Sequence, residues 1–346
     1  MPSRHRPRRP VTVRCTPHST AHVPPCQPGC SDRHRACRGG RRSRQRGRGT
    51  IRVCYDQDVP TRLSGLGRRM IKRLMLTAGW FPARRTARSD VASLIHELHP
   101  MHPARTASRS GADEAFLIRM GPLDDGGYLV PDDLDGITAL FSPGTGHLTD
   151  FEVDAAARGM RVHAADGSIA PGDVPNRSVM TSFQQVFLGP HDDGEHVSMA
   201  SWVSECEPGE EDDFMLQMDI EGGEYLTLVA TPGSVLQRFR IIVLEVHDLS
   251  RLWDEAFFPL ARAMFQKLNE SHQVVHVHPN NVGGVSAYDG ISIPGIAEFT
   301  YLRRDRLDGG TLQPAGTFPH PLDAPNSLVQ PDLALPANWY RQGRGR

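Results

Sequence analysis

The chain has 346 residues, enough for one large α/β domain with extensions or for two small domains. Its net charge of −1 conceals a basic segment joined to an acidic body, because residues 1–50 carry +12 and the remainder carries −13. An acidic body argues against a nucleic-acid enzyme, which needs a basic surface, and the lack of any run of 18 apolar residues argues against a membrane-spanning helix.

Residues 1–69 are predicted to form a disordered basic leader. They are rich in Arg, Pro, Gly, His and Ser and show no hydrophobic period, so they cannot bury enough apolar surface to offset the entropy of ordering. Three interpretations remain open: a basic arm that contacts nucleic acid or anionic lipid, a transit peptide, or upstream DNA translated from a start codon assigned too early. We favour the third, because the segment that begins at Met70 is typical of an amino terminus.

The cysteines follow the same division of the chain. Five of the six lie in the first 54 residues, and Cys206 alone lies in the body, which is typical of a reduced, cytoplasmic domain. Cys26, Cys30 and Cys37, with His34 between them, offer zinc-binding atoms but form no paired CxxC motif. We therefore expect a cytoplasmic protein and give the zinc interpretation little weight.

Residues 70–112 are predicted to form an N-terminal helical extension. The first twelve residues, 70–81, are basic and amphipathic, which suits either weak peripheral contact with a membrane or an ordinary packing helix, and we favour the helix. Residues 89–98 place apolar side chains at positions i, i+3, i+4 and i+7, which predicts a capped amphipathic helix.

Strands and helices alternate through residues 113–306. Strands are expected at 136–142, 161–165, 197–203, 214–219 and 240–246. Helices are expected at 149–158, after the segment 220–224 as far as about 230, and at 252–270. Thr149 and Glu152 have the spacing of a capping box at the start of the first of these helices. Such alternation predicts a parallel sheet.

The end of this domain departs from the alternation. Two strands, 274–278 and 297–303, are separated by a loop alone, so they are expected to pair as an antiparallel hairpin at the end of the sheet. Residues 307–346 are polar and rich in proline, and are expected to form a loose C-terminal tail.

A glycine-rich loop follows the first strand of the domain. Gly144 and Gly146 would let a ligand approach the backbone, and the helix that follows favours a carboxylate or phosphate at its amino terminus; the alternative is a simple tight turn. The full GxGxxG motif is absent, which argues against NAD. Asp166 ends the next strand, 20 residues after Gly146, where an acidic side chain can bind ribose hydroxyls or simply occupy a surface turn.

Acidic residues follow the strand 214–219. Asp219 could accept a proton from a hydroxyl, contact a ligand's amino group, or hold a divalent metal. Glu221 and Glu224 could face the same ligand or could stabilise the start of the next helix.

Histidines end two further strands. His247 is suited to proton transfer near neutral pH and could instead form a metal site with Asp219 and Asp248; the alternative is a packed His beside a capping Asp. His276 and His278 share one face of their strand, so we expect one to be buried and the other to point at substrate.

Taken in order, these segments resemble the FkbM-type S-adenosylmethionine-dependent methyltransferases. The resemblance covers about 113–306 and rests on residues 125–131, 141–152, 217–225, 241–249 and 276–281. The most specific piece is Asp-Ile-Glu-Gly-Gly-Glu at 219–224, because the family typically carries Asp-x-Glu-Gly-x-Glu there. In one departure, the loop starts with Ser142-Pro143 where many methyltransferases place an acidic residue.

The resemblance implies a Rossmann-like class I fold, S-adenosylmethionine as methyl donor, and O-methylation. It places Gly144 and Gly146 at the methionine part of the donor, Asp166 at the ribose and Asp219 at the junction of donor and acceptor. The full set of predicted cofactor-binding residues is Ser142, Gly144, Gly146, Asp166 and Glu221.

The leading hypothesis is an O-methyltransferase that acts on a hydroxyl of a sugar, glycan or related natural product. Asp219, His247 or His278 would be the base, and positioning of the acceptor would contribute most to the rate. A second hypothesis is a catalytically inactive nucleoside-binding module in a glycan-assembly system. A third, a nicotinamide-dependent oxidoreductase, is disfavoured by the missing third glycine and by the terminal hairpin.

Overall fold

A computed structural model describes residues 52–55, 80–103, 116–207, 209, 212–307 and 311–341. Every element below lies within residues 51–346. The candidate zinc ligands Cys26, Cys30, Cys37 and His34 lie outside the described residues, as does most of the predicted leader. Within the described ranges, no helix combines the length and the apolar character needed to cross a bilayer.

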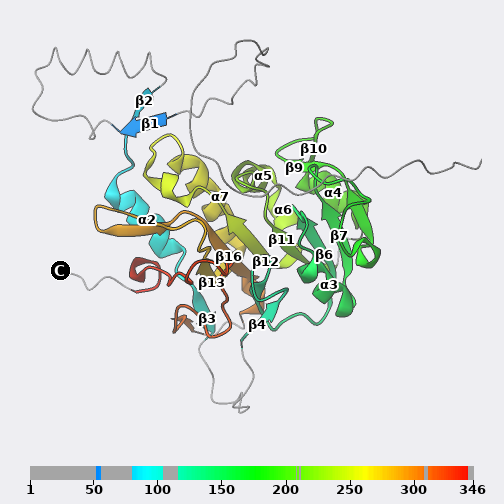
Figure 1. Cartoon of the computed structure of the whole chain (residues 1–346). Coiled ribbons are helices and arrows are strands. Elements are labelled where there is room, and N and C mark those ends of the chain that lie inside the picture. Colours follow the sequence, from blue (N-terminus) through cyan, green and yellow to red (C-terminus); the bar gives the residue numbers. More distant parts are fainter. Residues whose placement is uncertain are drawn as a thin grey trace, which may run out of the picture. The chain divides into compact units, whose positions relative to one another are not determined.

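The body is built on a seven-stranded sheet. Its strands are β6 (Ile137–Pro143), β7 (Arg161–Ala165), β8 (Ser182–Gln184), β11 (Asp213–Met218), β12 (Phe239–Val246), β13 (His272–Pro279) and β16 (Ala297–Arg303). They lie in the order β13-β16-β12-β11-β6-β7-β8, and Figure 1 labels the strands from β13 to β7. β16 is antiparallel to both of its neighbours, and the other adjacent strands are parallel.

This order contains a reversal between β6 and β11. The chain first builds outward from β6 to β8 and then returns to build from β11 in the other direction. In open α/β sheets, ligands bind beyond the carboxyl ends of the strands at such a point. A mixed seven-stranded sheet with helices in its connections is an α/β fold.

The predicted antiparallel pair is present as β13 and β16, but the connection between them is more than a loop. It contains a second hairpin, formed by β14 (Val285–Tyr288) and β15 (Ile291–Pro294). β16 is also inserted between β12 and β13 rather than added at the outer edge.

Helices and a hairpin cover the sheet. The helices are α2 (Arg88–Glu97), α3 (Asp150–Ala157), α4 (Met199–Cys206), α5 (Glu224–Ala230), α6 (Gly233–Leu236) and α7 (Phe258–Ser271). Side chains from α2, α4, α5, α6 and α7 form one hydrophobic core with the sheet. A second core contains side chains of α3 and of the hairpin formed by β4 (Leu117–Met120) and β5 (Tyr128–Pro131). The sheet residues in this core alternate along the strands with those of the first core, so the two cores lie on opposite faces of the sheet.

The remaining elements are short. They are β1 (Arg52–Tyr55), β2 (Trp80–Ala83), β3 (Met101–Pro103), β9 (Phe187–Gly189), β10 (His196–Ser198), β17 (Leu312–Pro314) and the 3₁₀ turns Arg177–Val179, Leu249–Trp253, Arg304–Arg306 and Ala337–Trp339. The pairing of β1 with β2 places a strand within the predicted leader, where four residues carry too little pattern to be recognised.

The prediction of a strand at 197–203 is wrong. After β10 the chain forms α4, because the Ser198 hydroxyl accepts a hydrogen bond from the Ser201 amide and caps the helix. Met199, Trp202 and Val203 recur at helical spacing and are buried. The strand that lies beside β7 at the edge of the sheet is β8. The predicted helix 252–270 also begins later, at Phe258, after a 3₁₀ turn.

The C-terminal segment 311–341 is not a loose tail. β17 pairs with β3, and Ala315, Leu335 and Trp339 are buried. The Trp339 indole donates a hydrogen bond to the Ser292 carbonyl. These anchors are too widely spaced to form a periodic pattern, so the sequence indicated only an irregular segment.

Candidate functional site

A pocket opens at the carboxyl ends of β6 and β11. The turn of the β4–β5 hairpin, the glycine loop with the start of α3, and the segment that follows β11 each contribute to its wall. The lining residues are Asp125, Gly126, Tyr128, Gly144, Thr145, Gly146, His147, Leu148, Phe151, Glu152, Gln217, Asp219 and Glu221. The structure thus brings together four of the predicted site residues, Gly144, Gly146, Asp219 and Glu221.

The glycine loop lies directly against the end of β11. Gly144 has φ +83°, and a Cβ on it would be 1.6 Å from the Asp219 carbonyl oxygen. The Gly144 amide donates to Ala165 and the Asp219 amide donates to the Pro143 carbonyl. Glycine is therefore required at 144 both for its left-handed backbone and for this close approach.

Ser142 lies beneath the loop and does not line the pocket, which corrects its prediction as a cofactor-binding residue. It is fully buried, and its hydroxyl bonds to the Glu152 carboxylate and to Gln217 Oε1, the latter at 2.6 Å. Burial raises the pKa of Glu152 to about 7, although the hydrogen bond with Ser142 opposes the shift. An acidic side chain thus does lie at the base of the loop, supplied by α3 rather than by the end of the strand.

The predicted capping box is wrong for the same reason. The Thr149 side chain does not cap α3, and its Oγ1 accepts a hydrogen bond from Asn176. Glu152 turns inward to Ser142 instead of reaching back to the start of the helix. The spacing of Thr149 and Glu152 matches a capping box, but the Glu152 carboxylate forms its hydrogen bond with Ser142 instead.

Asp166 ends β7 as predicted, but both of its carboxylate oxygens already bind protein groups. Oδ2 accepts from the Gly146 amide at 2.8 Å, and Oδ1 accepts from the amide and the hydroxyl of Ser168. The side chain is buried and does not line the pocket. Its observed contacts hold the glycine loop to β7.

His247 lies at the centre of an acidic cluster that joins the ends of β11 and β12. Its Nδ1 lies 3.1 Å from Glu224 Oε1. Its Nε2 lies 3.4 Å from Glu221 Oε2 and 3.9 Å from both Asp219 Oδ1 and Glu245 Oε1. The buried atoms Asp219 Oδ1, Glu224 Oε2 and Glu245 Oε2 have no hydrogen-bond partner.

The electrostatics of this cluster follow from crowding and burial. Desolvation, with the neighbouring acidic groups, raises the pKa of Asp219 to about 7 and that of Glu245 to about 9, and His247 lowers both. Desolvation alone would lower the pKa of His247, but its hydrogen bond to Glu224 and the surrounding carboxylates raise it to about 9.

Asp248 is not part of the cluster, which corrects the predicted metal set of Asp219, His247 and Asp248. Its backbone has φ +59°, and its carboxylate pairs with exposed Arg251 at 2.9 Å. Glu245 takes its place. The sequence contained the signal, because residues two apart on a strand face the same side, so Glu245 and His247 could have been predicted together.

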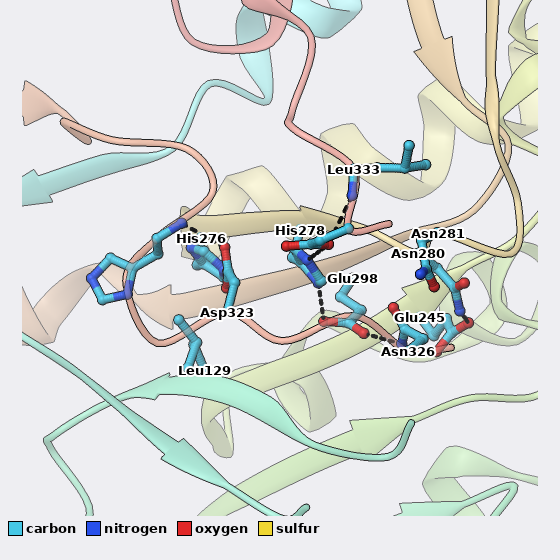
Figure 2. Close-up of polar contacts among 12 residues, drawn as sticks. Leu129, Glu245, His276, His278, Asn280, Asn281, Glu298, Asp323, Asn326 and Leu333 are labelled. Atoms are coloured by element: carbon cyan, nitrogen blue, oxygen red, sulfur yellow. Dashed lines mark hydrogen bonds and ion pairs between the residues drawn. The ribbon is translucent and has the colours of Figure 1, made fainter. Parts of the chain in front are cut away.

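His278 is buried away from the pocket, which corrects its prediction as a base. Its Nδ1 lies 3.2 Å from Glu298 and its Nε2 lies 3.0 Å from Asp332 in the C-terminal segment. His276 likewise bonds to buried Asp323 at 2.9 Å. Figure 2 shows His278 with Glu298, and His276 with Asp323. Asn280, in the same view, donates to Glu245 at 2.8 Å and so links the two regions.

Several residues of the pocket wall were not among the predicted site residues. Tyr128 and Gln217 are both buried, and the Gln217 amide lies 3.5 Å from the Tyr128 hydroxyl. Gln217 alternates with Asp219 along one strand face, which was an available signal. Tyr128 reaches the pocket only because the β4–β5 hairpin folds over the sheet, where Leu129 accepts a hydrogen bond from Thr300.

No family model and no curated protein matches the sequence. Among solved structures, a protein from Thermoplasma acidophilum aligns with 13% identity and a TM-score of 0.28, over 49% of this chain and 80% of the other. The SAM-dependent methyltransferase from Agrobacterium tumefaciens aligns with 12% identity and a TM-score of 0.27, over 64% of this chain and 76% of the other. A structure from echinomycin biosynthesis aligns with 15% identity and a TM-score of 0.29, over 48% and 76%. Likenesses this distant carry no argument, so the fold assignment rests on the sheet topology described above.

Proposed function

We propose that the protein is an S-adenosylmethionine-dependent O-methyltransferase. One observation carries the proposal: a glycine loop packs against the backbone of Asp219 at the reversal point of a sheet that contains the inserted antiparallel strand β16. Dinucleotide-binding sheets of the doubly wound type lack this insertion, and their third loop glycine is absent here.

The charge of the pocket supports a cationic donor. Glu152, Asp219 and Glu221 line it, and Asp125 stands across from them on the hairpin turn. The donor carries an ammonium group and a sulfonium group, and the sulfonium supplies an activated methyl. Acidic side chains around the glycine loop would hold the ammonium group by charge-assisted hydrogen bonds.

Asp219 is the residue we assign to the acceptor. It lines the pocket at the end of β11. Its role is to orient the acceptor hydroxyl and accept the proton. His247 is a positioning residue, held by Glu224 on one side and directed at Asp219 on the other.

The acceptor class comes from the resemblance to FkbM-type enzymes, which implies a hydroxyl of a sugar, glycan or related natural product. The pocket wall is consistent with a polar acceptor, because Tyr128, Gln217 and the carboxylates offer hydrogen bonds to hydroxyl groups.

Calorimetry with S-adenosylmethionine, followed by a methyl-transfer assay on a panel of glycans, tests the proposal. We expect binding and turnover by the wild-type chain, and binding without turnover by Asp219→Ala. Donor binding with no turnover on any acceptor would favour the inactive nucleoside-binding module. Binding of NADH in place of S-adenosylmethionine would instead support an oxidoreductase.

A further inference from the structure

We propose that Asp219, Glu245 and His247 form a binding site for a divalent metal ion at the edge of the pocket. Each side chain offers one ligand atom, and these atoms all lie within 4.8 Å of one another. Donor atoms bound to one cation at about 2.1 Å lie roughly 3–4 Å apart. Small side-chain movements would therefore bring the three onto a common ion.

Buried and unpartnered oxygens are the first argument for the site. The Glu245 side chain is 4% exposed, and its Oε2 has no hydrogen-bond partner, while Oε1 accepts from Asn280. Asp219 Oδ1 is also buried without a hydrogen-bond partner. A buried carboxylate is costly unless it is paired or coordinates a metal.

Charge is the second argument. In the part of the chain that the structure describes, the ion pairs of Asp219, Glu224 and Glu245 all involve His247. With exposed Glu221, whose Oε2 lies 3.4 Å from Nε2, four carboxylates share one imidazole. The three less exposed ones, Asp219, Glu224 and Glu245, alone leave at least two negative charges uncompensated when all are ionised. A divalent cation supplies the missing charge.

The orientation of His247 is the third argument. Its Nδ1 faces Glu224, whose side chain is fully buried, and its Nε2 faces Asp219 and Glu245. Histidines that bind metals commonly donate their other ring N–H to a carboxylate, which fixes the tautomer and directs the free nitrogen at the ion. Glu224 in turn accepts hydrogen bonds from the amides of Ile220 and Gly222, which hold it in place.

The donor set indicates the class of ion. Two carboxylates and one imidazole suit ions such as Mn²⁺ better than soft ions that select thiolates. Three protein donors leave coordination positions open for oxygen atoms of a bound molecule. Asp219 would use Oδ1 for the metal and keep its second oxygen for the acceptor.

Titration of the metal-free full-length chain with Mn²⁺, followed by electron paramagnetic resonance of the free ion, tests the site. We expect one bound ion, binding weakened more than about 100-fold in Glu245→Gln, and binding weakened about 10- to 100-fold in Glu224→Gln. Asp248→Asn is the matched control, because Asp248 adjoins His247 but pairs with Arg251. It should bind Mn²⁺ like the wild type.

The site is overturned if the wild type binds Mn²⁺ no tighter than about 1 mM, or if Glu245→Gln binds as well as the wild type. Equal weakening by Asp248→Asn would also overturn it, since that result means diffuse acidic attraction. Circular dichroism confirms that each variant is folded. The titration contains neither donor nor acceptor, so its failure leaves the methyltransferase proposal intact, and failed donor binding leaves the metal site intact.

Discussion

Two clusters of histidines and carboxylates lie near the same edge of the sheet, and they differ in how completely their polar atoms are paired. Around His247, oxygens of Asp219, Glu224 and Glu245 are buried without partners. Around His278, both ring nitrogens face carboxylates, Glu298 and Asp332.

This difference in pairing distinguishes the His247 cluster, which we assign to the functional site, from the His278 cluster, which is a structural network. Both clusters combine the same residue types on neighbouring strands, so residue type alone assigns them the same role. In the His278 cluster the C-terminal segment supplies Asp332, which faces the second ring nitrogen of His278. In the His247 cluster no described residue gives the three carboxylate oxygens a hydrogen bond, and they remain beside the pocket. Unpaired buried polar atoms need an explanation such as a ligand or ion.

The largest expected effect on activity comes from a substitution in the His247 cluster. Asp219→Ala should lower kcat/KM for methyl transfer by about 10²- to 10⁴-fold, the usual contribution of a general base. Its thermal stability should change little, because the removed Oδ1 is buried without a hydrogen-bond partner and lies 3.9 Å from His247 Nε2. Steady-state kinetics and a thermal melt check both statements. Full activity in Asp219→Ala would end its assignment.

A substitution in the His278 cluster should lower stability and leave activity unchanged. His278→Gln leaves Glu298 and Asp332 without their imidazole partner, so it should lower the free energy of unfolding by about 3 kcal/mol. Urea unfolding measures this loss. Activity per folded molecule should be unchanged, and a stable but inactive His278→Gln enzyme would return His278 to the list of bases.

A glycine substitution tests the close contact between the glycine loop and the end of β11. Gly144→Ala forces a Cβ against the Asp219 carbonyl and should cost about 2 kcal/mol of stability and weaken donor binding. Gly222→Ala is the matched control, because Gly222 also has positive φ but meets nothing within 4 Å. If both variants weaken donor binding equally, backbone strain rather than the close approach is responsible.

The smallest effect is a dependence on pH. The pKa of His278 is raised to about 9, because its bond to Glu298 and the nearby charges of Asp323 and Asp332 outweigh desolvation. A raised pKa stabilises the fold fully below the unfolded value and loses that contribution as pH rises through the folded value. The stability difference between wild type and His278→Gln should therefore narrow by about 1–2 kcal/mol between about pH 6.5 and 8. A difference that widens over this range would contradict the pairing.

The sequence by itself determined the features that depend on local pattern. Strand and helix alternation, the glycine loop after β6 and the acidic residues after β11 all follow from periodicity and turn chemistry among neighbours in the chain. Local pattern also misled at 197–203, where a short apolar run fits either a strand or a helix.

Only the tertiary structure decided which of these residues share the site. His278 looked as available as His247, but its partner Asp332 lies 54 residues further along the chain. Glu152 forms a hydrogen bond with Ser142 instead of capping the helix, and Glu245 rather than Asp248 lies beside His247. Each of these outcomes depends on which atoms meet across the sheet after folding, and long-range pairing leaves no periodic trace in the sequence.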